Sequence, residues 1–141
     1  MTNNILNELK KLYRVSSLVA MLFNESKYTP YTVRDIFEIL KSYERVTSDN
    51  VRMAVKRLYL SGAIDKAGAR CAEYSCDKQL PINASDVVLS QLYYSIIECH
   101  GYDISDCLLK DTLVTSSITR LLNYNLIYKK GNLFYRKEQI S

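Results

Sequence analysis

The stretch that decides the fold is Ser48-Asp-Asn-Val-Arg-Met-Ala-Val-Lys-Arg-Leu-Tyr-Leu-Ser-Gly-Ala-Ile64. Its apolar residues recur at spacings of three and four, which predicts an amphipathic helix over Asp49–Ser61. Thr47 or Ser48 can cap the start of this helix, and Gly62 can end it. An extended pair is expected directly afterwards, over 63–66 and 70–75, with a turn at Ala67-Gly68-Ala69.

The residues on both sides of this stretch show similar helical and extended patterns. Two helices are expected upstream, Asn4–Phe23 and Val33–Tyr43, and Thr32 can cap the second. Three helices are expected downstream, and they are Asp86–His100, Ile104–Leu109 and one from Asp111 or Thr112 to Tyr124. The alternating residues 126–137, centred on Gly131-Asn132, predict a β-hairpin.

The two halves of the chain repeat an order of three helices and a hairpin. An offset of 63 residues aligns six identical pairs, which are Val51 with Val114, Arg57 with Arg120, Leu58 with Leu121, Ile64 with Ile127, Lys66 with Lys129, and Gly68 with Gly131. An offset of 71 residues places Tyr31 against Tyr102. The two offsets differ in the loop between the second and third helices, where a change of length is tolerated. The sequence therefore predicts an internal duplication.

Three short helices followed by a hairpin resemble the winged-helix domain, and Ser48–Ile64 is similar to its recognition helix and first wing strand. Thr115–Ile127 resembles a second copy, with Asn125 where the first copy has Gly62. The resemblance implies a chain that is mainly α with small β-hairpin wings (α+β), built from two winged-helix modules in tandem. The first module, with an extended N-terminal helix, would span residues 1–79 and the second 80–141. Members of this family commonly bind DNA, and others use tandem copies for protein contacts.

The composition is that of a globular protein. Of the 141 residues, 48% are hydrophobic and 24% are charged, which excludes a disordered chain. No stretch approaches the roughly 18 apolar residues of a membrane span, so no membrane partner is expected. Residues 1–5 lack the basic and apolar layout of a signal peptide, which predicts a cytoplasmic protein.

The positive charge is concentrated in one segment, from Arg45 to Arg70. Its basic residues are Arg45, Arg52, Lys56, Arg57, Lys66 and Arg70, and its acidic residues are Asp49 and Asp65. This excess equals the formal net charge of +4 of the whole chain. A local excess of this kind indicates a surface that binds an anion, with nucleic acid as the first candidate, although a solvated helix face would also explain it.

In the first repeat, the outward positions of the third helix carry residue types that recognise DNA. Asparagine and arginine pair with the edges of adenine and guanine, and lysine and arginine suit phosphates. The expected DNA-binding residues are Asn50, Arg52, Met53, Lys56 and Arg57 on the helix, with Lys66 and Arg70 at the wing.

The second repeat has mostly uncharged residues at the corresponding positions. These outward residues are Thr112, Leu113, Thr115, Ser116 and Thr119, followed by Arg120. Its wing is basic, through Lys129, Lys130, Arg136 and Lys137, but five acidic residues precede it, which are Asp86, Glu98, Asp103, Asp106 and Asp111. We expect Thr115, Lys129 and Lys130 to contribute a weaker DNA contact, or this repeat to bind a protein.

No sequence pattern indicates an enzyme, a cofactor or a metal site. The spacings among Cys71, Cys76, Cys99 and Cys107 include no C-x2-C pair, so these cysteines are expected to be buried apolar residues without disulfides. Cys99 and His100 are neighbours on a predicted helix, so their side chains diverge and make a poor nucleophile–base pair.

These features predict a small sequence-specific protein that binds double-stranded DNA. Such a protein would be a cytoplasmic, nucleoid-associated transcriptional regulator of the compact type found in phages and mobile elements. The alternative is a winged-helix adaptor or inhibitor of a host protein complex, which the neutral second half and the 12 tyrosines favour. A replication initiator is a third option. A homodimer is also expected, because the long first helix carries more apolar residues than the first module needs for its core. The alternative is that these residues pack on the second repeat of the same chain.

Overall fold

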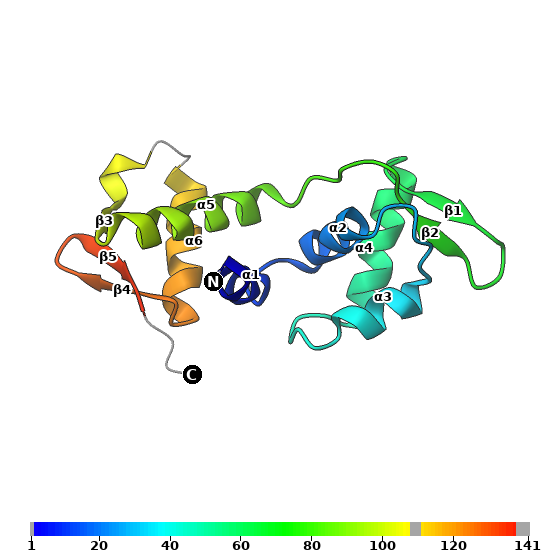
Figure 1. The fold of residues 1–141 in the computed structure, drawn as a ribbon, viewed down its shortest axis with the longest axis horizontal. Coiled ribbons are helices and arrows are strands. Elements are labelled where there is room, and N and C mark those ends of the chain that lie inside the picture. Colours follow the sequence, from blue (N-terminus) through cyan, green and yellow to red (C-terminus); the bar gives the residue numbers. More distant parts are fainter. Residues whose placement is uncertain (1, 108–110, 138–141) are drawn as a thin grey trace. The chain divides into compact units, whose positions relative to one another are not determined.

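The computed structural model describes residues 2–107 and 111–137, which form helices and small antiparallel sheets (Figure 1). The expected mixture of helices with small β-sheets is therefore confirmed. The chain divides into two compact units. We call Tyr13–Asn83 the central unit, and Met1–Leu12 together with Ala84–Ser141 the split unit.

The central unit contains the helices α2 (Val15–Glu25), α3 (Val33–Leu40) and α4 (Ser48–Leu60). Threonine hydroxyls cap α3 and α4, because Thr32 accepts a hydrogen bond from the Asp35 amide and Thr47 accepts one from the Asn50 amide. These bonds satisfy amide groups that have no acceptor inside their helices. The three helices enclose an apolar core that includes Val19, Phe23, Ile36, Val51 and Val55.

A hairpin of β1 (Asp65–Ala67) and β2 (Glu73–Ser75) follows α4. Tyr31, just before α3, pairs with Tyr74 through backbone hydrogen bonds of 2.8 and 2.7 Å and so adds a short third segment to the sheet. The predicted second strand over 70–75 is too long, because Gly68 and Cys71 both have a positive φ and the turn extends between them. The hairpin itself lies where it is predicted.

The split unit begins with α1 (Thr2–Lys10) and continues with six elements after residue 83. These are α5 (Ala84–Cys99), β3 (Tyr102–Asp103), the 3-10 helix η1 (Ile104–Asp106), α6 (Asp111–Asn123), β4 (Ile127–Lys130) and β5 (Leu133–Arg136). The strands form one sheet in the order β3-β5-β4, with Tyr102 opposite Phe134. Tyr31 and Tyr102, which the repeat aligns, thus both pair with the second strand of a hairpin. Of the helix expected over Ile104–Leu109, residues 108 and 109 lie outside the described residues.

The prediction of one helix over Asn4–Phe23 is wrong. The helix stops at Lys10, and α2 begins after Arg14, whose backbone is extended with φ −66° and ψ 151°. The apolar stripe continues through this break, but its two parts enter different cores: Leu9 and Leu12 belong to the split unit and Leu18 to the central unit. Residues 1–12 therefore group with the second half of the chain, not with the first. Leu9 and Leu12, two of the apolar residues behind the homodimer expectation, are buried in the split unit, whereas Ile5 and Leu6 are only half-buried, and the homodimer stays a prediction.

Polar side chains attach α1 to the rest of the split unit. The Tyr93 hydroxyl donates a hydrogen bond to the Glu8 carboxylate, which also accepts one from Arg136 at 3.0 Å. Burial, followed by the bond to Glu8, raises the pKa of Tyr93 far above its ordinary value, so this hydroxyl keeps its proton. Arg120 donates to the carbonyl of Leu12 and pairs with Asp86 at 3.1 Å. These bonds tie residues near the start of the chain to α5, α6 and β5.

Candidate nucleic-acid interface

The helix α4 buries one side in the core of the central unit and exposes the other to solvent. Val51, Ala54 and Val55 are buried, and the five residues expected to meet DNA on this helix are exposed: Asn50, Arg52, Met53, Lys56 and Arg57. At about 100° per residue, Arg52 and Arg57 lie about 140° apart around the helix, with Lys56 between them. The exposed side of α4 is therefore broad, and its three basic residues share it with Asp49 and with the exposed apolar side chains Met53, Tyr59 and Leu60.

Two α4 side chains expected to contact bases already have partners on the protein surface. Arg52 forms an ion pair with Asp49 at 3.1 Å, and the two side chains are 64% and 82% exposed. An ion pair this exposed contributes little stability, so exchanging it for a base or a phosphate costs little. The amide of Asn50 donates to the carbonyl of Arg45 at 3.3 Å.

The hairpin places further positive charge beside the end of α4. The Lys66 ammonium lies 5.4 Å from the centre of the Tyr59 ring, and that ring makes an edge contact with Tyr74 of β2. This aromatic contact joins α4 to the hairpin. Arg70 lies in the turn and is exposed. The central unit thus presents exposed cations on both the helix and the hairpin.

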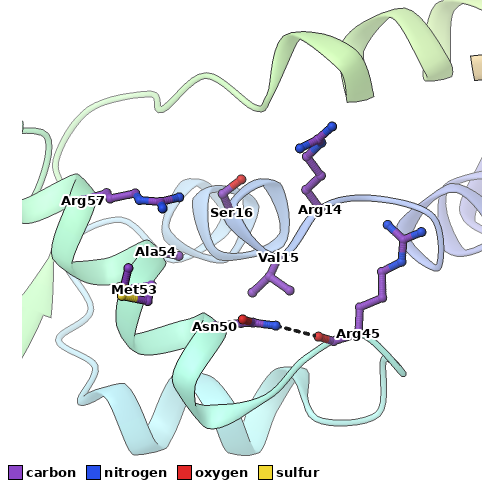
Figure 2. Close-up of a pocket in the computed structure, with 8 residues that line it drawn as sticks. All are labelled: Arg14, Val15, Ser16, Arg45, Asn50, Met53, Ala54 and Arg57. Atoms are coloured by element: carbon purple, nitrogen blue, oxygen red, sulfur yellow. Dashed lines mark hydrogen bonds between the residues drawn. The ribbon is translucent and has the colours of Figure 1, made fainter. Parts of the chain in front are cut away.

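A hollow of about 620 Å³ on the central unit brings three arginines together (Figure 2). Arg14 precedes α2, Arg45 precedes α4, and Arg57 belongs to α4. The other lining residues are Val15, Ser16, Asn50, Met53 and Ala54. No acidic residue lines this hollow within the described part of the chain. Three of the predicted DNA-binding residues, Asn50, Met53 and Arg57, thus share this hollow.

Arg14 was not among the residues predicted for the interface. The sequence places it inside a continuous helix, whereas the structure ends that helix earlier and puts Arg14 at the start of α2. No side chain caps this start, unlike those of α3 and α4. No local signal in the sequence distinguishes Arg14 from any other basic residue on an amphipathic helix.

The split unit provides less positive charge than its sequence suggests. Arg120, expected among the outward residues of the second repeat, points inward, where its side chain is only 19% exposed and pairs with Asp86. Arg136, counted with the basic wing, pairs with Glu8. The outward placement of Arg120 is therefore wrong, whereas Arg136 lies on the hairpin but has its charge paired within the unit. The acidic partners are distant in sequence and meet these arginines only in the folded unit.

The remaining predicted residues of the split unit are exposed. Thr115 lies on α6, where neighbouring hydroxyls bond to backbone carbonyls, as in the 3.0 Å bond from Thr119 to Thr115. Lys129 and Lys130 lie on β4, and the Lys129 ammonium is 5.6 Å from the ring centre of Phe134. This unit therefore offers two exposed lysines on a strand and uncharged hydroxyls on a helix.

The cysteines only partly match their prediction. Cys76 is buried, but Cys71 and Cys99 are exposed, because Cys71 lies in the hairpin turn and Cys99 ends α5. Within residues 2–107 and 111–137, no group of three or more His, Cys, Asp or Glu side chains is placed to hold a metal ion. No helix among the same residues has the length and apolar character to cross a membrane.

Comparison of the chain with protein-family models, with curated proteins and with solved structures gave no match.

Proposed function

We propose that this chain is a small sequence-specific protein that binds double-stranded DNA and acts as a transcriptional regulator. The observation that carries the proposal is the set of exposed basic residues shared by α4 and the adjacent hairpin: Arg52, Lys56, Arg57, Lys66 and Arg70. An exposed helix of this kind fits the major groove, and cations on a hairpin beside it suit the phosphate backbone.

The proposal includes two winged-helix modules in tandem. It is supported by the order of elements in each unit, in which helices precede a hairpin and a short extended segment pairs with the second hairpin strand. It is also supported by the helix ends, because Gly62 and Asn125 both have a positive φ after α4 and α6, at aligned positions of the repeat. A fold alone does not define a function, so the exposed side chains carry the argument for DNA.

Gel-shift titration of the full chain with duplex DNA over a range of salt concentrations tests the proposal. The affinity is expected to fall steeply as salt rises, because each phosphate contact releases counterions and adds about 0.9 to the slope of log K against log salt. An affinity that does not change with salt concentration, or no binding to any duplex, contradicts the proposal.

Arg52→Ala is expected to reduce affinity for the preferred DNA sequence by about 1–3 kcal/mol and to relax the sequence preference, because a bidentate arginine–guanine contact is lost. Lys56→Ala and Arg70→Ala provide the comparison. Each is expected to weaken all sequences alike and to lower the salt slope by about one. The measurement is a fluorescence-anisotropy titration with a selected duplex and a scrambled one. An equal loss on both duplexes for Arg52→Ala would place this residue on the backbone instead.

The split unit is expected to contribute only backbone contacts. Lys129→Ala and Lys130→Ala should each lower the salt slope by about one, whereas Thr115→Ala should be nearly silent, because a hydroxyl carries no charge to exchange for counterions. The same titrations measure this effect. If the double lysine variant abolishes binding and Arg52→Ala changes nothing, the two units have the opposite roles.

A second candidate function is that of a protein-binding adaptor or inhibitor. It is favoured by the split unit, where Arg120 and Arg136 form internal ion pairs while large apolar side chains are exposed on α6 and the residues that follow it: Leu122, Tyr124 and Tyr128. Exposed tyrosines are enriched at protein interfaces. Co-purification of a defined partner at high salt after nuclease treatment would support this function.

A further inference from the structure

The hollow at the start of α2 and along α4 is lined by side chains that can donate hydrogen bonds to an anion. Arg14, Arg45 and Arg57 reach it from three separate segments, and none of the described residues that line it is acidic. Guanidinium groups are always charged at physiological pH, so the lining itself contributes three formal positive charges. A cluster of this kind is stabilised when an anion enters it.

We infer that this hollow is a binding site for a phosphate-bearing anion with more than one negative charge. Arginine presents a planar fork of donors that matches the spacing of phosphate oxygens, and such charge-assisted hydrogen bonds are among the strongest in proteins. Ser16 and Asn50 add a hydroxyl and an amide to the lining. Figure 2 shows Arg57 at one end of the hollow and Arg14 and Arg45 at the other, with Ser16 and Asn50 between them.

The size of the hollow favours a ligand larger than one phosphate. Its volume of about 620 Å³ lies within the range of small-molecule sites, about 300–1,000 Å³. Val15, Met53 and Ala54 give it an apolar portion, which suits the sugar and base of a nucleotide. The same phosphate chemistry is available from the backbone of a duplex. The two sources are a free nucleotide and DNA, and only the second rests on the proposed function.

A free nucleotide in this hollow would compete with DNA. Asn50, Met53 and Arg57 line the hollow and also belong to the surface proposed to meet DNA. Occupation by one ligand therefore weakens the other, and by linkage the effect is reciprocal.

The first arm of the test measures free anions. Pyrophosphate and ATP are titrated calorimetrically into the full chain, into an Arg14→Gln/Arg45→Gln variant, and into a Lys27→Gln/Lys41→Gln control. The control also removes two exposed cations from the central unit, but neither lysine lines the hollow. At least tenfold weaker binding in the arginine variant, with unchanged binding in the control, supports a free-anion site. Circular dichroism melts establish that both variants keep the fold.

The second arm measures duplex DNA with the same three proteins. If DNA supplies the phosphate, free anions bind none of them, and the arginine variant lowers the salt slope by about two while the control leaves it unchanged. The inference is overturned if the arginine variant matches the original chain in both arms, or if the original chain binds neither free anion nor DNA. If the chain binds pyrophosphate or ATP through these arginines but binds no duplex, the proposed function fails and the anion site stands.

Discussion

Arg120→Met is expected to destabilise the split unit by about 3–5 kcal/mol. The Asp86 side chain that Arg120 contacts is fully buried, and methionine keeps much of the apolar length of arginine while removing its charge. The variant removes the guanidinium partner of the buried Asp86 carboxylate, and breaking a buried ion pair by removing one partner is costly. The variant also loses the hydrogen bond from the Arg120 side chain to the carbonyl of Leu12, and this bond helps to hold the residues that follow α1.

Urea unfolding followed by circular dichroism measures the decrease in the free energy of unfolding, and hydrogen exchange shows which helices are destabilised. Faster exchange is expected in α5 and α6, with α2, α3 and α4 changed much less. Arg52→Met is the matched control, because its ion pair with Asp49 is highly exposed and such pairs contribute about 0–1 kcal/mol. Combining Asp86→Asn with Arg120→Met should recover part of the lost stability, because the buried charge is then removed as well. Equal effects of Arg120→Met and Arg52→Met would contradict the structural role of Arg120.

Reversing two charges of the central unit, by Lys56→Glu and Arg70→Glu together, is expected to weaken duplex binding by at least about a hundredfold. Each reversal removes a favourable phosphate contact and places a carboxylate near the phosphate backbone, where like charges cost several kcal/mol. Since tenfold in affinity is about 1.4 kcal/mol, the combined loss exceeds about 2.8 kcal/mol. Both residues are exposed, so the free energy of unfolding should change little.

The control for this experiment is Lys27→Glu with Lys41→Glu, which changes the net charge of the central unit by the same amount. Neither of these lysines lies on α4 or the hairpin strands. Anisotropy titrations at one fixed salt concentration compare the two double variants with the original chain. If the control weakens binding as much as the α4 and hairpin variant, general charge explains the affinity and the proposed surface is wrong.

Local patterns were sufficient to predict the central elements of the fold. The apolar spacing of residues 49–61, the capping threonine Thr47 and the stop at Gly62 all act within one or two helical turns, and α4 has these features. The turn at Gly131-Asn132 is similarly local, and the strands β4 and β5 flank it. The exposure of Arg52 and Lys56 follows from the same helical period.

Long-range contacts explain what the sequence did not predict. The apolar period runs through residues 11–14 without a change, and only the division into two cores shows why the helix ends there. The helical pattern of residues 111–124 places Arg120 among the outward residues. Its inward direction in the structure depends on Asp86, which is 34 residues away in the sequence. The arginine hollow likewise requires the fold, because Arg14, Arg45 and Arg57 come from separate segments.

The assignment of α1 to the split unit also affects the order in which the chain can fold during synthesis. The ribosome makes residues 13–83 in one run, so the central unit has all its parts as soon as that run has emerged. The helix α1 leaves the ribosome earlier but lacks its partners, since Tyr93, Arg120 and Arg136 are still to be made. Its buried residues Leu9 and Leu12 therefore remain exposed while the central unit folds. The helix α1 is thus made before the central unit but reaches its buried position only after residues 84–136 have been made.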